Sequence, residues 1–517
     1  MINKIHFFLF IIFFYYLFYN TGLHGDDYIA IYNAKNKSFI DFVNLNPNSN
    51  GIAIFYPVNY LLFWWLYFFA NSNYLFIFDT FKFLINLLSL FFIYKFLSQY
   101  ISFTRAIVLA FLIITFPLHE STMYWYMASP YVFTAGMIMI SHYLINKQYY
   151  KTGFILLIIG TFTSYASPPY VFGLSIIFLF EKKFIRFLLF NLSGIAYIVF
   201  YLYISYKFPN IQLRIEENNN FFLIINNLLI QFLSSIDVFI GPSFWLKIFV
   251  SISSNSIFSI LICSLFIFFI YISKINISSK TENENYLLFS FCGIFIFSIL
   301  MFSLTGKYPQ IAFNLGNRVT IFGSFLLAYL IILIPKKYFN IFLVFFLLAV
   351  TGISNHWKEW NQKQLKIINN INNNYQIKEL KKDDILFIKD NQYSNLKIYS
   401  NIEFFVLPWI IKPIFSNHNI EKIVSINSNI KITENFIFDK KNGGRMNLLN
   451  NINKKYNIFL YDTETNKVSK ESIEKIKKIK LSTPKPLRHW LQLINLKIIS
   501  KYINKLNPRY INYFYEK

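Results

Sequence analysis

Residues 5–28 have the sequence IHFFLFIIFFYYLFYNTGLHGDDY, in which an apolar segment ends in a short polar loop with two adjacent carboxylates. Only Lys4 precedes the apolar segment and no small-residue cleavage site follows it, so we interpret it as a retained membrane span and not as a signal peptide. Asp26 and Asp27 then stand at the mouth of this span. Because desolvating a carboxylate is costly there, the pair must sit in water, pair with cations or do chemistry.

The whole chain has the composition of an integral membrane protein. Of its 517 residues, 55% are hydrophobic and 21% aromatic, and only 14% are charged. A soluble core could not bury so much apolar surface. The two cysteines, Cys263 and Cys292, lie in apolar segments, so we expect free thiols, with neither a disulfide framework nor a zinc site.

Most of the formal net charge of +24 belongs to a polar C-terminal tail. Beyond Asn355 lie 29 of the 49 Lys and Arg residues but only 14 of the 25 Asp and Glu residues. The tail has no patterned Arg cluster, so a basic surface beside anionic lipid headgroups explains the charge better than nucleic-acid binding does. We therefore expect the lipid bilayer, and no nucleic acid, as a partner.

Apolar segments recur along residues 1–355 and predict an all-α multi-pass membrane domain. Two of the apolar stretches, 52–70 and 221–240, could either lie along the interface or dip into the membrane and return. The others are long enough to cross. About eleven crossings are predicted from this length criterion, at roughly 5–20, 75–97, 104–118, 123–145, 151–168, 169–181, 184–206, 256–273, 286–304, 319–334 and 338–354.

Loop charge orients these spans. If 52–70 does not cross, the most basic loops all share one side, which the positive-inside tendency makes the cytoplasm. These loops contain Lys95, Arg105, Lys147, Lys151, Lys182, Lys183, Arg186, Lys274, Lys280, Lys336 and Lys337. The Asp26–Asp27 loop, the turn at His119–Glu120, residues 305–318 and the tail are then external, which in a bacterial inner membrane is the periplasmic side.

The tail, residues 356–517, predicts a small external α/β domain. Strand-like runs occur at 385–388, 423–426, 436–438 and 458–461. Residues 404–415, FFVLPWIIKPIF, are too short to span and too aromatic to be free in water, so we expect them to rest on the membrane or against the transmembrane body. A basic amphipathic helix is predicted after Pro486. The Asn-rich run 369–374 is predicted to be a loop.

Asp26 and Asp27 are the first candidates for chemistry. When a hydroxyl attacks a sugar carbon, a carboxylate can accept the hydroxyl proton as the bond forms. A neighbouring acid can raise the proton affinity of the first or fix its orientation. The structural alternative is an interfacial turn, with Gly25 as a bend and one Asp capping the short helix that follows.

The second group is His119 and Glu120, followed by the aromatic run Tyr124-Trp125-Tyr126. Aromatic rings beside an acid hold a pyranose well, because the apolar face of the sugar stacks while the acid accepts hydroxyl hydrogen bonds. The alternative is an interfacial aromatic belt with a hydrated turn. The sequence leaves both interpretations open.

Arg318 is the third candidate, in the segment NLGNRVT at the external start of a span. A guanidinium there can bind phosphate oxygens in a bidentate manner, or simply extend to the lipid headgroups. Lys307 and His24 are weaker candidates for the same phosphate role. For Asp79 with Lys82, which predict a helix ion pair at one-turn spacing, and for Asp237 we favour structural roles.

The chain has no Walker loop, no dinucleotide fingerprint, no His/Cys metal spacing and no nucleophile elbow. Nucleotide-driven chemistry is therefore not expected, and no metal site or cofactor is predicted. What remains is a set of acids, aromatic residues and one arginine on the external face.

These features resemble the GT-C superfamily of glycosyltransferases that use polyprenyl-phosphate-linked sugars. The likeness lies in a first span, the external GDDY at 25–28, an aromatic interfacial helix from Phe55-Tyr56-Pro57 to Phe69, many further spans and an external tail. Protein O-mannosyltransferases, the aminoarabinose transferase of lipid A and bacterial O-antigen glucosyltransferases share this layout. The resemblance covers residues 1–355 as architecture, and Arg318 matches the family's phosphate-binding basic residue by role and side.

The resemblance implies transfer of a sugar from a polyprenyl phosphate to a glycan, lipid or protein acceptor by a single inverting displacement. Asp26 or Asp27, with Asp26 preferred, would deprotonate the acceptor hydroxyl, and Arg318 would stabilise the leaving phosphate. Glu120, Tyr124 and Trp125 would orient the sugar or the acceptor. No divalent metal is implied.

Two other classes of function stay open. A transporter or flippase of a lipid-linked or hydrophobic solute predicts internal repeats and helices broken at mid-membrane, and the sequence shows no convincing repeat. A non-catalytic envelope protein would use the spans only to anchor the tail. Against the latter, eleven spans are many for an anchor, and the acids would gather on the external face by accident.

Overall fold

The structure is a computed structural model of the chain. It describes residues 4–36, 60–72, 76–207, 221–272, 284–305, 308–390, 392, 402, 404–405, 408–426, 430–432, 437–439 and 457–479. Within these residues the chain forms two compact units. The first contains residues up to Gly22 and 34–357, and the second contains residues 23–33 and the tail from Lys358.

The first unit is entirely helical in the part that the structure describes. Its longer helices are α1 (Lys4–Phe18), α5 (Tyr60–Phe69), α6 (Phe76–Leu97), α7 (Phe103–Ile114), α9 (Pro130–Asn146), α10 (Tyr150–Thr163), α11 (Ser167–Phe180), α12 (Phe184–Lys207), α13 (Phe221–Phe239), α14 (Pro242–Ser253), α15 (Ile257–Ile272), α16 (Glu284–Thr305) and α17 (Ile321–Ile332), together with the part of α18 (Lys336–Asn373) up to Trp357. Four short segments lie between them: η2 (Pro117–His119), α8 (Ser121–Tyr124), η3 (Tyr126–Ala128) and η4 (Leu315–Thr320).

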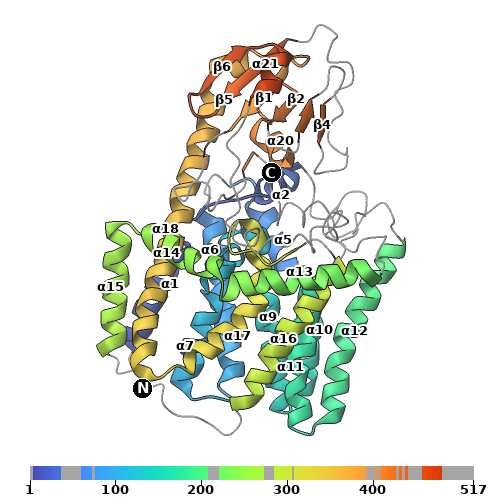
Figure 1. The fold of residues 1–517 in the computed structure, drawn as a ribbon, viewed down its shortest axis with the longest axis vertical. Coiled ribbons are helices and arrows are strands. Elements are labelled where there is room, and N and C mark those ends of the chain that lie inside the picture. The colour runs from blue at the N-terminus through green and yellow to red at the C-terminus, as the bar shows by residue number, and fades with distance from the viewer. Residues whose placement is uncertain are drawn as a thin grey trace. The chain divides into compact units, whose positions relative to one another are not determined.

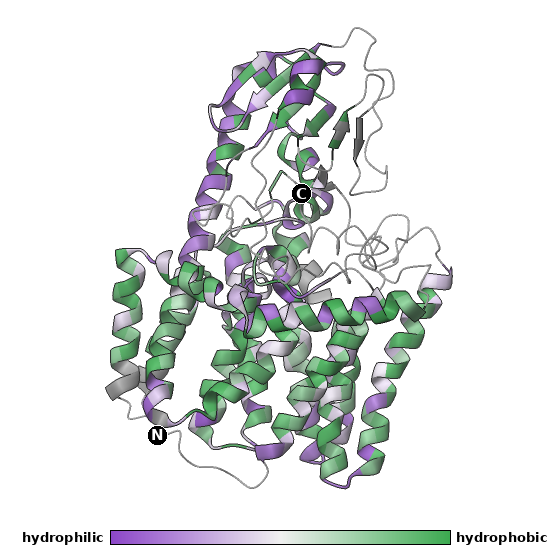
Figure 2. Ribbon diagram, in the orientation of Figure 1, coloured by the Kyte–Doolittle hydropathy of each residue, from purple (hydrophilic) through white to green (hydrophobic). Residues whose placement is uncertain are grey.

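These helices confirm a helical membrane protein. Among the described residues, seven helical stretches are long and apolar enough to cross a membrane, and five shorter apolar helices accompany them. Figure 2 shows that hydrophobic residues predominate along these helices. On α12, Leu188 and Val199 are both more than half exposed. Side chains of this kind, exposed on a long apolar helix, indicate contact with lipid. The prediction of about eleven crossings stays a prediction.

One predicted span is interrupted. We expected a single helix over 123–145, but the chain forms α8 and η3 first and enters the long helix α9 only at Pro130. Trp125 is extended between the two short segments, and Pro130 can begin a helix but cannot continue one from Tyr126. The sequence signal for this break is Pro130, which a criterion of length and hydropathy does not consider.

Two further predictions concern the orientation of α13 and the end of α18. Helix α13 runs across one end of α12 and α16 in Figure 1, an orientation that favours the interfacial alternative for 221–240. The prediction of a loop at 369–374 is wrong over most of its length, because α18 continues to Asn373. It ends where the Asn374 side chain accepts hydrogen bonds from the backbone of Gln376 and Ile377 and caps the next short helix, α19 (Tyr375–Lys378).

Helices α11 and α16 pack closely through glycine. A Cβ atom on Gly173 would lie only 2.4 Å from the Ile294 backbone nitrogen, and Gly293 faces the Gly173 Cα atom. Small residues that let helix backbones approach are the usual means of association where lipid surrounds the helices. The crossing of α11 and α16 therefore depends on Gly173.

The second unit contains the predicted α/β domain. Its main sheet has the order β2-β1-β5-β6, formed by β1 (Ile385–Lys389), β2 (Lys422–Ser425), β5 (Ile458–Asp462) and β6 (Lys467–Lys470). Strands β2, β1 and β5 are parallel, with Ile385 opposite both Lys422 and Ile458, and β6 is antiparallel to β5. A separate hairpin pairs β3 (Ile430–Ile432) with β4 (Ile437–Asp439).

An apolar core supports the main sheet. It contains Ile385, Phe387, Ile426 and Ile476, the last on helix α21 (Ile473–Lys478). The four strand-like runs predicted from sequence correspond to β1, β2, β4 and β5 to within one residue, which confirms them. Residues 404–415 form η6 (Pro408–Ile410) and α20 (Ile411–Ile414) where the structure describes them. The helix predicted after Pro486 lies outside the described residues.

Replacement of Gly173 by Val tests the α11–α16 crossing. The added side chain must displace the backbone of Ile294, so we expect destabilisation of about 1–3 kcal/mol, the usual result of overpacking. The measurement is the thermal unfolding midpoint of the purified protein in detergent. Leu192→Val on the exposed face of α12 is the control, and a midpoint equal to that of the control would contradict the packing described above.

Candidate functional site

The candidate site of the first unit lies where its helices are interrupted. Segment η4 contacts both η2 and α8, and η2 also contacts α14 and α17. Backbone that is not part of a long helix leaves polar groups to satisfy, so within an apolar domain it is tolerated only when protein buries it or when it lines a cavity. These segments carry Glu120, Trp125 and Arg318, three of the predicted site residues.

Glu120 is the centre of a buried ionic cluster. One of its carboxylate oxygens forms an ion pair with the Lys247 ammonium group of α14, and the other accepts a hydrogen bond from the Asn317 amide. Asn317 Oδ1 in turn accepts from the Ser121 backbone N–H at 3.3 Å. All four residues are buried. The cluster therefore joins α8, α14 and η4, and the Glu120 charge is neutralised inside the protein.

Arg318 follows Asn317 directly and lies among aromatic rings. Its guanidinium carbon is 5.1 Å from the Trp125 ring centroid and 5.2 Å from that of Tyr308. Its Nε donates to the Tyr131 hydroxyl at 3.3 Å, and Tyr131 contacts Tyr165 edge-on, with ring centroids 5.6 Å apart. We call these four aromatic residues the Arg318 cradle. Stacking of this kind fixes the plane of the guanidinium fork.

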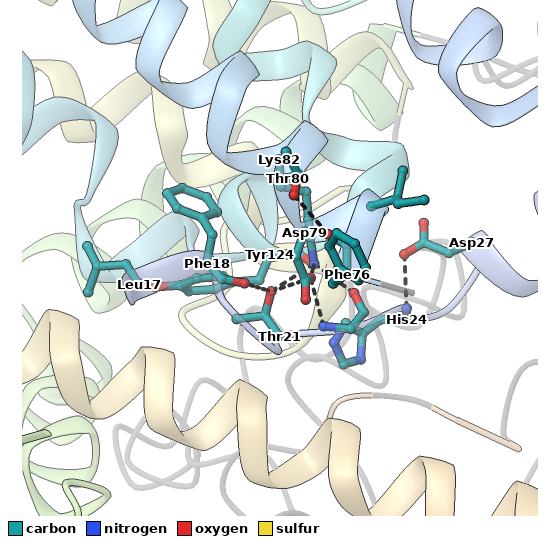
Figure 3. Close-up of polar contacts among 12 residues, drawn as sticks. Leu17, Phe18, Thr21, His24, Asp27, Phe76, Asp79, Thr80, Lys82 and Tyr124 are labelled. Carbon is teal, nitrogen blue, oxygen red and sulfur yellow. Dashed lines mark hydrogen bonds and ion pairs between the residues drawn. The ribbon is translucent and has the colours of Figure 1, made fainter. Parts of the chain in front are cut away.

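A second buried ion pair holds the chain where it leaves α1. Asp79 and Lys82 of α6 are 2.8 Å apart, as their spacing predicted, which confirms the helix ion pair. Asp79 accepts from the Gly22 backbone N–H and the Thr21 hydroxyl, while Lys82 donates to the carbonyls of Gly22 and Tyr124. Figure 3 shows these bonds. They fix Gly22 in a conformation with φ of 73°, which favours glycine.

The paired acids of the GDDY motif belong to the second unit and differ in their contacts. Asp27 closes its own turn, since its Oδ2 accepts from the His24 backbone N–H at 2.9 Å at the start of α2 (Asp27–Asn36) (Figure 3). Asp26 accepts a hydrogen bond from the Trp409 indole N–H at 2.7 Å. Burial, and secondarily the Asp27 charge, raise the pKa of Tyr28, which therefore stays protonated. The Asp27 side chain thus closes the turn that precedes α2, and the helix cap considered as a structural alternative stays a prediction.

Several predicted site residues have structural contacts instead. His119 has both ring nitrogens engaged, Nδ1 with the Thr122 hydroxyl and Nε2 with the Ile113 carbonyl, each at 2.8 Å. Tyr124 packs between Phe18 and Trp357. Lys307 lies outside the described residues. The structure therefore brings Glu120, Trp125 and Arg318 together and places His119 and Tyr124 in the surrounding core.

Sequence reasoning missed the partners of these residues. Lys247 is the one basic residue of α14, and an isolated charge within an apolar stretch could have marked it as a buried ion-pair partner. Asn317 stands beside Arg318 without any pattern of its own. The three tyrosines of the Arg318 cradle were hidden among 37 tyrosines in the chain.

No metal centre and no relative identifies the site. Among the residues that the structure describes, no group of three or more His, Cys, Asp or Glu side chains could hold a metal ion. Comparison of the chain with protein-family models, with curated proteins and with solved structures gave no match. Function must therefore be inferred from the chemistry of the side chains.

Replacement of Lys247 by Met tests whether the Glu120 cluster holds the site together. The change leaves Glu120 buried without its cation, which typically costs about 3–5 kcal/mol. We expect a lower unfolding midpoint in detergent and partial recovery in the double variant Glu120→Leu/Lys247→Met, because an apolar pair leaves no buried charge. Lys151→Met, at an exposed position of α10, is the control. Equal midpoints for Lys247→Met and Lys151→Met would refute the role of the cluster.

Proposed function

We propose that this chain is a membrane glycosyltransferase. It moves a sugar from a polyprenyl phosphate carrier to a cell-envelope acceptor by a single inverting displacement, on the external side of a bacterial inner membrane. The observation that carries the proposal is Arg318, a cation fixed by aromatic rings next to a carboxylate whose charge is already neutralised. The Trp125 and Tyr308 rings lie against the guanidinium, and a guanidinium whose plane is fixed in this way can direct its N–H groups at phosphate oxygens.

The donor chemistry fits this arrangement. A polyprenyl phosphate sugar has one phosphate as its leaving group, and a guanidinium can pair with two of its oxygens at once. The charge on that phosphate grows as the bond to the sugar breaks, so a fixed cation stabilises the transition state more than the ground state. Trp125 and the tyrosines of the Arg318 cradle offer faces on which the apolar side of a sugar can stack.

The acceptor chemistry needs a base, for which Asp26 is the better candidate. The acceptor hydroxyl oxygen attacks the anomeric carbon, its proton passes to the carboxylate, and the bond between that carbon and the phosphate oxygen breaks. Asp27 accepts a hydrogen bond within its own turn, whereas Asp26 accepts one from the Trp409 indole N–H, which can orient its carboxylate. The proposal therefore assigns proton removal to Asp26 and closure of the turn before α2 to Asp27.

A transporter or flippase of a lipid-linked solute is the second candidate. The interrupted segments at 117–128 and 315–320 favour it, because transporters bind their substrates at broken helices. Transport forms no glycosidic bond and needs no general base. The two candidates are therefore separated by whether a product with a new glycosidic linkage appears.

Asp→Asn substitutions test the assignment of the base. Membranes that contain equal amounts of the wild type, Asp26→Asn or Asp27→Asn are supplied with lipid-linked sugars, and transfer to endogenous acceptors is measured. Loss of a general base typically costs about 10²–10⁴ in rate, so we expect a loss of this size for Asp26→Asn and a smaller one for Asp27→Asn.

Asp390→Asn, at the end of β1, is the matched control and should transfer sugar at the wild-type rate. Equal transfer by all the variants would remove the acids from the mechanism. The absence of turnover in the wild type with every donor tried, together with movement of the lipid-linked sugar across the membrane, would favour the transporter.

A further inference from the structure

The second unit contains a contact between two segments that lie almost 400 residues apart in sequence. Trp409 of η6 donates its indole N–H to Asp26 Oδ1 at 2.7 Å. The Tyr28 and Phe404 rings lie 5.8 Å apart, and the Lys412 ammonium lies 5.7 Å from the Tyr32 ring centroid. The tail segment 404–412 therefore contacts the short stretch 26–32 at three points.

The residues contacted by the tail segment lie on one face and at the start of helix α2. Tyr28 and Tyr32 are four residues apart on α2 and so lie on the same face of that helix. Asp26 immediately precedes the helix, and its carbonyl accepts from the Ala30 backbone N–H. The tail segment thus holds both the first turn of α2 and the carboxylate that precedes it.

The tail segment is itself firmly packed. Phe404, Phe405, Ile411 and Phe415 are buried, and the Phe404 and Phe405 rings are 4.4 Å apart. Helix α20 contacts strand β2 of the main sheet. Trp409 therefore belongs to a segment anchored on the α/β domain, and it is half-buried itself.

We infer that Trp409 is a positioning residue, through which the α/β domain holds the Asp26 carboxylate in a fixed orientation. The indole can only donate, so its partner oxygen must accept, and the direction of the carboxylate is set by that bond. Only the catalytic meaning of this orientation rests on the proposed function. From the sequence we expected residues 404–415 to rest on the membrane or against the transmembrane body; in the structure, Phe404 contacts Tyr28 of α2 and Trp409 bonds to Asp26.

Hydrogen exchange of the full-length protein in lipid nanodiscs tests this inference without any assay of transfer. The reporter amides are Asp27 N–H and Ala30 N–H, which bond to His24 O and Asp26 O. In Trp409→Phe, which keeps a ring but removes the donor, we expect these amides to exchange roughly tenfold faster, as loss of a hydrogen bond to a charged acceptor predicts. Amides of β1 and β5 should keep the wild-type rate.

Two further variants make the result specific. Asp26→Asn keeps an oxygen that accepts from the indole, so its reporter amides should exchange at the wild-type rate, whereas those of Asp26→Ala should exchange as fast as those of Trp409→Phe. Trp245→Phe, at an exposed position of α14, is the control and should change nothing. Faster exchange in β1 and β5 of Trp409→Phe would mean that this variant disrupts the α/β domain. The inference is then tested by Asp26→Ala, which removes the acceptor of the same hydrogen bond.

Wild-type exchange at the reporter amides in both Trp409→Phe and Asp26→Ala would overturn the inference. Transfer assays on the same samples add a second measure, since a positioning role predicts a lower kcat for Trp409→Phe with an unchanged KM for the lipid-linked donor. A wild type that transfers no sugar would count against the proposed function, and the exchange result would still decide whether Trp409 holds the Asp26 loop.

Discussion

The buried contact of Glu120 with Lys247 and Asn317 is the interaction on which the candidate site depends. It connects Glu120 to two segments of the first unit that lie 127 and 197 residues further along the sequence. Each carboxylate oxygen has a donor, so the cost of burying the charge is offset within the cluster. Asn317 is part of that cluster, and Arg318 is the next residue, so the position of the guanidinium depends on the position of Glu120. Glu120, which we expected to bind sugar, thus anchors the segment that carries Arg318.

The same principle operates at the Asp79–Lys82 pair. In both places a stretch of backbone in the apolar helical domain lies outside the long helices, so its N–H and C=O groups need other hydrogen-bond partners. A buried lysine donates to carbonyl oxygens, as Lys82 does to Gly22 and Tyr124, or neutralises an acid, as Lys247 does. A carboxylate or an amide oxygen accepts hydrogen bonds from the buried backbone N–H groups of these interrupted stretches. Charged side chains thereby make interrupted helices possible, and interrupted helices are where a membrane protein can bind a polar ligand.

Sequence patterns predicted those features that depend on near neighbours. Apolar length identified α6, α12 and α16, short β-branched runs identified β1 and β5, and spacing along one helix identified the Asp79–Lys82 pair. The sequence could not show that Lys247 meets Glu120 or that Trp409 meets Asp26, because those partners are 127 and 383 residues apart. The break before α9 was missed for another reason, since the spans were predicted from apolar length, which does not consider Pro130. The sequence therefore pointed to Glu120, Trp125 and Arg318 but not to the contacts that support them.

The central claim is that the Arg318 cradle binds a lipid-linked phosphate, and direct binding tests it most simply. The wild type and Arg318→Ala are placed in lipid nanodiscs and titrated with a polyprenyl monophosphate, and with the corresponding uncharged polyprenol, while binding is followed by native mass spectrometry. The account predicts that the wild type binds the phosphate at least tenfold more tightly than the alcohol, since a hydrogen bond to a charged group contributes about 1.5–3 kcal/mol, and that Arg318→Ala loses this preference. Equal binding of the two lipids by the wild type, or an unchanged preference in Arg318→Ala, would contradict it.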